Sequence, residues 1–192
     1  RVLAEELRSH PRFAGSLDDE TIQLLFKSAP LHDVGKVAIP DAILLKPGKL
    51  TAEEWVIMKQ HCVAGRNAII SSAQELSEGD DAFLGHAAQI AYCHHERWDG
   101  NGYPRGLSGD DIPLGARLMA VADVYDALIS KRIYKRAFSH EQSIQMMAAE
   151  RGSHFDPDAL DAMLSLADEF DAIAGRYRDT SEEVTALESR LS

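Results

Sequence analysis

Hydrophobic residues recur along most of the chain at the three- and four-residue spacing that one face of an α-helix requires. The first seven residues, RVLAEEL, already follow this spacing, and so do segments that begin near residues 19, 51, 82, 114 and 139. No stretch alternates apolar and polar residues for long enough to predict a β-strand. The pattern therefore predicts an all-α fold, a globular multi-helix bundle.

Polar residues and glycines indicate where some of these helices begin and end. Thr51 and Glu54 have the spacing of a capping box, in which two side chains satisfy the free amides of a helix start. We expect that helix to run from about 51 to 70 and the next one to span about 82–96. Residues 99–113 are rich in glycine and proline between strong helical patterns, which predicts a long ordered loop.

Composition and charge narrow the class of protein. The 192 residues carry 20 Lys and Arg against 31 Asp and Glu, a formal net charge of −11. This balance disfavours a broad surface for nucleic acid or for anionic membrane. Apolar runs are too short for a membrane span, a signal peptide is not apparent, and two cysteines match a reducing compartment. We therefore expect a cytoplasmic protein with no DNA, RNA or membrane partner.

Histidines and aspartates in apolar surroundings carry the candidate chemistry. These residues are His32, Asp33, His61, His94, His95 and Asp123. A polar group in such surroundings is costly unless a partner compensates it, and imidazole and carboxylate suit iron, manganese, nickel or zinc. Adjacent side chains on a helix point about 100° apart. The pair His32 and Asp33 therefore favours a site with several metal ions, in which the carboxylate bridges two of them.

Five residues near these candidates have less specific interpretations. Cys62 and Cys93 each adjoin a candidate ligand, but a helical neighbour points about 100° away, so we expect small core residues and not thiolate ligands. Glu96, Asp99 and Asp126 fit two roles equally well: orienting the imidazoles, or capping and bonding within loops.

Four strings around the candidates closely resemble the HD-GYP family, bacterial phosphodiesterases of cyclic di-GMP within the HD metal-hydrolase superfamily. The strings are HDVGKVAIPDAILLKPGKLTAEEW, His61 followed by Gly65, HHERWDGNGYPRGLSGDDIP, and ADVYDALISKRIYK. The resemblance extends from about residue 30 to residue 164. It implies a helix bundle of the HD superfamily type and metal-dependent hydrolysis of cyclic di-GMP to pGpG, with onward cleavage to GMP left open.

The resemblance also implies roles for individual residues. The implied metal ligands are His32, Asp33, His61, His94, His95 and Asp123. Asp33 and Lys36 are the implied catalytic residues, with Lys36 beside the metals and the scissile phosphate. The implied substrate-binding residues are Lys36, Arg132, Lys135, Gly102, Tyr103 and Pro104. Two divalent transition metals are implied, or three, with iron or manganese favoured over nickel or zinc.

The start of the chain departs from the family pattern. The family has a further metal-binding histidine on a helix well upstream of the His-Asp pair. His10 lies only 22 residues before His32 and follows a loop signal, so it is a poor counterpart. We therefore expect residues 1–192 to be one HD-GYP domain that lacks the first part of its N-terminal helix. A receiver or other sensory domain is expected to precede it in the full protein.

Two other functions stay open beside hydrolysis of cyclic di-GMP. One is hydrolysis of a related cyclic dinucleotide at the same metal centre. The other is a non-catalytic module that binds nucleotide, or that uses the loop with Gly102, Tyr103 and Pro104 to contact a partner such as a diguanylate cyclase domain. The complete set of downstream ligands favours an enzyme over an interaction module.

Overall fold

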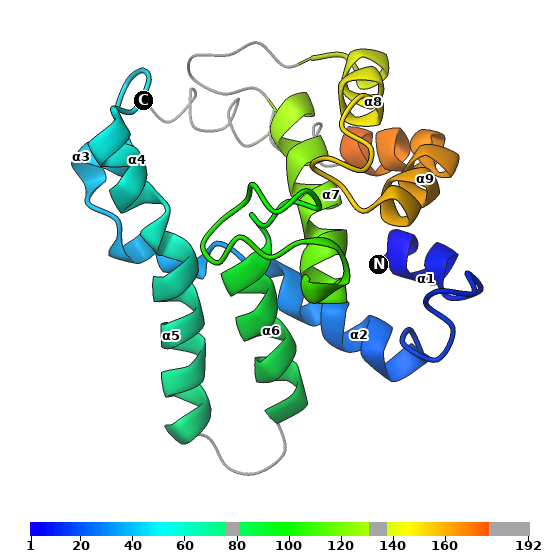
Figure 1. The fold of residues 1–192 in the computed structure, drawn as a ribbon, viewed down its shortest axis with the longest axis horizontal. Helices are drawn as coiled ribbons and strands as arrows, with labels where there is room; N and C mark the ends of the chain where they lie inside the picture. The colour runs from blue at the N-terminus through cyan, green and yellow to red at the C-terminus, as the bar shows by residue number, and fades with distance from the viewer. Residues whose placement is uncertain (76–80, 131–137, 177–192) are drawn as a thin grey trace, which may run out of the picture.

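The computed structural model describes residues 1–75, 81–130 and 138–176 (Figure 1). Within these ranges the regular elements are α-helices and short 3-10 helices without a strand, which confirms the all-α prediction. No helix in this part of the chain has both the length and the apolar character needed to cross a membrane. The helix expected from about residue 180 lies outside the described residues.

In chain order the elements are α1 (Val2–Leu7), α2 (Asp19–Ser28), η1 (Ala29–Leu31), η2 (Val34–Ala38), α3 (Asp41–Leu44), α4 (Ala52–Met58), α5 (Gln60–Glu75), α6 (Asp81–Cys93), η3 (Gly109–Asp111), α7 (Leu114–Ile129), α8 (His140–Ala148) and α9 (Pro157–Ser165). The connections between the elements differ in length, and the longest, residues 94–108, lies between α6 and η3.

The helix predicted from residue 51 begins as expected but is divided in two. The Thr51 hydroxyl accepts from the Glu54 amide at 3.3 Å, and the Glu54 carboxylate accepts from the Thr51 amide at 2.7 Å, so the capping box is confirmed. α4 nevertheless ends at Met58, and α5 starts at Gln60. Lys59 between them has a ψ of −19°, the tighter winding of a 3-10 turn. This local overwinding starts a new helix directly before His61.

Two hydrophobic clusters meet along α6. The larger cluster buries side chains of α1, α2, α6, α7, α8 and α9, among them Leu7, Val121 and Leu160. The smaller cluster holds Ile69 of α5 against the alanines of α6. Figure 1 shows α5 and α6 side by side and α7 near the middle of the molecule. The C-terminal end of α6 is thereby held from two sides, which is a rigid setting for the residues that follow it.

A close approach of two glycines joins η2 to the first turns of α5. A Cβ atom on Gly35 would lie 2.0 Å from the His61 carbonyl oxygen and 2.4 Å from the Gly65 nitrogen. Only glycine therefore fits at position 35 while η2 packs this tightly on α5. The contact brings the segment that contains His32 and Asp33 directly beside His61.

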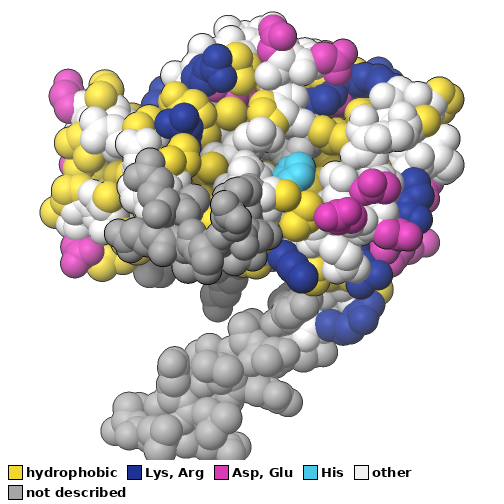
Figure 2. Space-filling model, turned by 90° about the horizontal axis from the view of Figure 1, so that it is seen from below, with side chains coloured by type: hydrophobic (Ala, Val, Ile, Leu, Met, Phe, Trp, Pro, Cys, Tyr) yellow, Lys and Arg dark blue, Asp and Glu magenta, His cyan; other side chains and the backbone are white. Residues whose placement is uncertain are grey.

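The described surface mixes charges of both signs. Figure 2 shows blue and magenta side chains next to one another on the right of that face, with yellow hydrophobic side chains gathered toward the left. Many of the basic groups are in ion pairs, such as Arg151 with Asp161 at 2.6 Å.

Candidate metal centre

Asp33 lies at the centre of a cluster of histidines. Its Oδ1 atom is 3.5 Å from Nε2 of His61 and 3.8 Å from Nε2 of His94. Its Oδ2 atom is 3.4 Å from Nε2 of His32 and accepts a hydrogen bond from the Lys36 ammonium. The two oxygens of one carboxylate therefore face two different groups of side chains.

The other two predicted ligands complete these two groups. The His95 ring centroid is 4.0 Å from that of His94 and 5.1 Å from that of His61. Asp123, from the middle of α7, has its Oδ1 atom 3.8 Å from Nε2 of His32. The structure thus brings together all six side chains singled out in the sequence, from the turns around η1 and η2, from α5, from the end of α6 and from α7.

Hydrogen bonds fix the ring orientation of three of the histidines. In each case Nδ1 contacts a backbone carbonyl oxygen three or four residues earlier, and a carbonyl can only accept, so Nδ1 carries the proton. The pairs are His32 with Ala29 at 2.8 Å, His61 with Met58 at 2.8 Å and His94 with Ile90 at 3.1 Å. In the neutral rings this leaves the Nε2 lone pair facing Asp33, the arrangement usual for histidines that bind a metal.

Unpaired buried atoms show that a cation fits between these groups. Oδ1 of Asp33 and Nε2 of His94 are both buried and have no hydrogen-bond partner among the described residues. Two acceptor atoms that face each other at 3.8 Å are unfavourable unless a proton or a cation lies near both of them. Imidazole nitrogens with carboxylate oxygens are the donor set of first-row transition metals. The residues therefore suit divalent metal ions.

Three members of the cluster, His94, His95 and Asp33, have the protonation states that metal binding requires. Burial, reinforced by the neighbouring His32, lowers the pKa of His94 to about 4. Burial and the neighbouring His94 lower the pKa of His95 as well. Although burial opposes it, hydrogen bonding to His32 and Lys36 holds the pKa of Asp33 well below its usual range. At neutral pH, His94 and His95 are therefore neutral and Asp33 is ionised.

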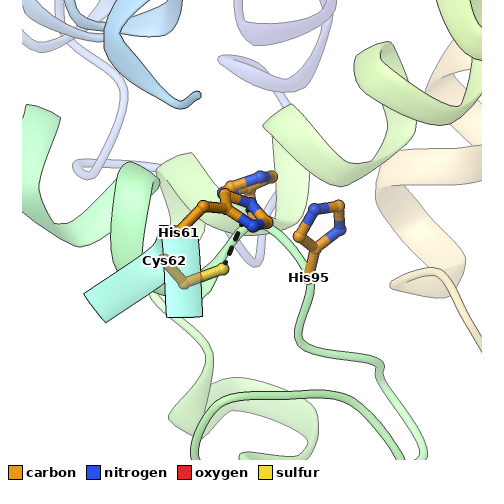
Figure 3. A group of neighbouring side chains, drawn as sticks. His61, Cys62 and His95 are labelled. Carbon is orange, nitrogen blue, oxygen red and sulfur yellow. Dashed lines mark hydrogen bonds between the residues drawn. The ribbon is translucent and has the colours of Figure 1, made fainter. Parts of the chain in front are cut away.

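Cys62 lies closer to the cluster than the sequence led us to expect. Its thiol is 3.5 Å from Nε2 of His61, to which it donates, and Figure 3 shows the two side chains beside His95. One ligand atom each from His61, Cys62, His94 and His95 lies within 4.8 Å of the others. As helical neighbours, His61 and Cys62 have Cβ atoms that point about 100° apart. The larger His61 ring and the short Cys62 thiol nevertheless come into contact. Burial raises the pKa of the Cys62 thiol to about 12, so without a metal it stays protonated.

The segment between α6 and α7, residues 94–113, here called the GYP loop, covers one side of the cluster. Tyr103 stacks on His95 with ring centroids 4.8 Å apart, and its amide donates to the His95 carbonyl at 3.2 Å. A Cβ on Gly102 would lie 2.3 Å from the Arg97 nitrogen, so only glycine allows the loop to cross so close to the end of α6. Pro104 follows a cis peptide bond.

Glu96 organises this loop and does not orient a metal-binding imidazole. Its carboxylate is buried and accepts hydrogen bonds from the amides of Arg105 at 2.8 Å and Leu107 at 3.0 Å. Asp99 likewise accepts from the Asn101 amide and pairs with Arg97. The sequence left two roles open for Glu96 and Asp99. The structure shows that both residues bond within the loop.

Basic groups near the cluster include one that the sequence analysis missed. Lys36 pairs with Asp33 inside the cluster, and Lys59 lies 5.0 Å above the Tyr103 ring. The only sequence signal for Lys59 is its position two residues before His61. Arg132 and Lys135, expected at the substrate phosphates, lie outside the described residues. His10 contacts Phe13 and Asp158 instead of the cluster.

Comparison with known proteins agrees with this geometry. The chain matches the HD domain family over residues 13–159. It is similar to a cyclic di-GMP phosphodiesterase of Vibrio cholerae serotype O1, with 50% identity over 181 residues, 94% of this chain and 36% of that protein. It is also similar to the cyclic di-GMP phosphodiesterase response regulator RpfG of Xanthomonas campestris pv. campestris, with 45% identity over 165 residues, 86% of this chain and 42% of that protein.

A third relative carries a different substrate in its name. This is 3'3'-cGAMP-specific phosphodiesterase 2 of Vibrio cholerae serotype O1, 45% identical over 163 residues, 85% of this chain and 30% of that protein. The chain thus spans between 30% and 42% of the length of these three relatives. From the match to most of its length and from the HD and GYP motifs at the cluster, the chain belongs to the HD domain family, in its HD-GYP branch.

Proposed function

We propose that this chain is the catalytic domain of a metal-dependent phosphodiesterase that hydrolyses cyclic di-GMP to linear pGpG. The observation that carries the proposal is the position of Asp33. One of its oxygens faces His61 and His94, and the other faces His32. A carboxylate placed in this way can join two neighbouring metal ions, which is the arrangement of two-metal phosphoryl-transfer sites.

Each part of the site has a proposed role in hydrolysis. Metal ions held by the six ligands would supply Lewis-acid polarisation of the phosphate and would activate a water. Asp33 holds the donor groups together, and the Lys36 ammonium adds positive charge beside it for the developing negative charge on the phosphate. Tyr103, stacked on His95, forms an aromatic wall against which the substrate packs. We assign Arg132 and Lys135 to the outer phosphate contacts.

Substitution of Asp33 tests the proposal directly. We expect Asp33→Ala to lose stoichiometric metal and turnover of cyclic di-GMP together, with a fall in kcat of at least about a thousandfold because the metals supply most of the catalysis. Metal content is measured by elemental analysis and turnover by separation of the nucleotides. The matched control is Asp161→Ala, which removes an exposed carboxylate paired with Arg151. Full activity in the Asp33 variant would refute the assignment.

The same centre supports a second substrate, because one relative is named a 3'3'-cGAMP phosphodiesterase. Both cyclic dinucleotides present two phosphodiesters to the metals and differ only in one base. A competition assay with equimolar cyclic di-GMP and 3'3'-cGAMP, compared by kcat/KM, separates the two. We propose cyclic di-GMP as the preferred substrate because two of the three relatives compared carry that name.

Three further features belong to the proposal. We assign two metal ions to this centre, with iron or manganese favoured for the imidazole and carboxylate donors and nickel or zinc as weaker alternatives. The relative named a response regulator supports control of this domain by an attached receiver or sensory domain. We place the protein in the cytoplasm, where the GYP loop is available to a diguanylate cyclase domain. Metal analysis of the full protein purified without oxygen tests the first of these.

A further inference from the structure

A pocket outside the metal centre opens between α5 and α6, next to the GYP loop. Its volume is about 490 Å³, within the range of small-molecule sites. α5 contributes Arg66 and Ile70, α6 contributes Leu84 and Tyr92, and the GYP loop contributes Arg105. None of the six candidate metal ligands lines this pocket, so a molecule bound there would leave the metal centre open.

Two guanidinium groups in this pocket have no carboxylate partner among the described residues. Six other arginines differ: Arg1, Arg8, Arg12, Arg97, Arg117 and Arg151 each pair with an aspartate or a glutamate. Arg66 and Arg105 form no such pair within the described ranges, although the protein has a net charge of −11. Two neighbouring cations that remain unneutralised on an acidic protein attract an anion.

The positions of the two guanidinium groups suit a shared anion. The Arg66 guanidinium lies over the Tyr92 ring at 5.1 Å from its centroid, a cation–π contact that orients it in advance. Both arginines also line the same pocket, Arg66 from α5 and Arg105 from the GYP loop. Two arginines that line one pocket can bind one phosphate group from two sides.

The rest of the pocket indicates an organic body attached to that anion. Ile70, Leu84 and Ala88 form an apolar wall, and the planar Arg66–Tyr92 pair adds a surface on which a flat ring can stack. Inorganic phosphate would bind the arginines but would leave the apolar wall exposed to solvent. A ligand with a phosphate at one end and a flat heterocycle at the other satisfies both parts.

We propose that the pocket between α5 and α6 binds a nucleoside monophosphate, with its phosphate between Arg66 and Arg105 and its base against the apolar wall. The inference rests on the lining of the pocket and is independent of the proposed phosphodiesterase activity. It adds a nucleotide site that does not require the metals.

Calorimetric titration of the chelator-treated protein with GMP tests this site apart from the metal centre. We expect saturable binding of GMP, and binding at least about tenfold weaker for guanosine and for inorganic phosphate, because each probe lacks one half of the ligand. Arg66→Gln and Arg105→Gln should each weaken GMP binding by about tenfold or more. The matched control Arg151→Gln, outside the pocket, should bind GMP like the wild type.

Chemical modification gives a second readout that needs no variant. Phenylglyoxal labels accessible arginines, and peptide mass spectrometry then shows which positions reacted. GMP should protect Arg66 and Arg105 in the metal-free protein and leave the labelling of Arg151 unchanged. The proposal is overturned if GMP does not bind without metal, if both glutamine variants bind as tightly as the wild type, or if phosphate alone binds as well as GMP.

Discussion

At the scale of single residues, the GYP loop depends on a buried carboxylate. Glu96 is only 2% exposed, a costly position for a charged group unless hydrogen bonds compensate the loss of water. The amides of Arg105 and Leu107 provide that compensation, one to each oxygen of Glu96. The carboxylate thus serves as a template around which the backbone beyond Tyr103 turns.

We expect Glu96→Gln to lower the free energy of unfolding by about 1–3 kcal/mol, because a carboxamide has one oxygen and leaves one of the two amides without an acceptor. Urea unfolding measures this loss. Hydrogen exchange at Arg105 and Leu107 should become faster. The control Glu6→Gln, an exposed position on α1, should change stability by less than about 0.5 kcal/mol. Equal stability of the two variants would contradict the template role.

Two glycines are expected to respond oppositely to alanine. A Cβ on Gly102 would lie 2.5 Å from the Glu96 Cα, so Gly102→Ala must displace the loop at a cost of about 1–3 kcal/mol. A Cβ added to Gly85, inside α6, would meet no atom within 4 Å outside its own stretch of helix backbone, and Gly85→Ala should stabilise by about 0.5–1 kcal/mol. Thermal unfolding and turnover should show losses in the first variant only. A Gly102→Ala protein as stable and active as the wild type would rule out the close approach.

At the scale of elements, the GYP loop is attached to the turn between α8 and α9. The Trp98 amide donates to the His154 carbonyl at 3.0 Å, and the Asp99 amide donates to the Ser153 carbonyl at 2.8 Å. The His154 ring stacks on Phe155 with centroids 4.4 Å apart. The loop over the candidate metal centre is therefore held by an element far from it in sequence.

This attachment should depend on pH. Burial and the charge of Arg97 lower the pKa of His154 below its ordinary 6.5. The unfolded chain then binds more protons than the folded one near that pH, so stability falls as the pH drops through 6.5. We expect His154→Phe, which keeps the stack on Phe155, to lose less stability between pH 7 and pH 5 than the wild type. Urea unfolding at several pH values measures both slopes, and identical slopes would exclude a contribution of His154.

At the scale of the whole molecule, the candidate metal centre joins separate parts of the fold. Its six side chains come from the turns around η1 and η2, from α5, from the end of α6 and from α7. α5 packs mainly on α6 and η2, whereas α7 belongs to the larger cluster with α1 and α9. Metal bound at this centre would connect the part of the fold that contains α5 with the larger cluster that contains α7.

Removal of the metals should therefore destabilise the molecule. A ligand present at a hundred times its dissociation constant stabilises the folded state by about 2.7 kcal/mol. We expect a chelator to lower the Tm of the wild-type protein and readdition of manganous salt to restore it. Asp33→Ala should show neither response. A wild-type Tm that is insensitive to chelation would contradict metal binding at this centre.

The local features of the fold were predictable because they depend on short-range physics. Helical spacing and the capping box of Thr51 and Glu54 depend on residues that are close together in the sequence, and both are confirmed. The break at Lys59 was not predictable, because helical propensity continues through it and the packing of η2 on α5 is a contact between distant segments. The proximity of Cys62 to His94 and His95 depends on the packing of α5 against α6, which is also a contact between distant segments.

By itself, the sequence determined the all-α class, the starts of several helices and the residue types able to bind a metal, because each depends on chemistry within a few positions. Only the tertiary structure decided that the oxygens of Asp33 face different donors, that Glu96 supports the loop, and that Arg66 and Arg105 share a pocket. These relations join atoms from separate helices. The packing of the whole core sets them, and no local pattern encodes that packing.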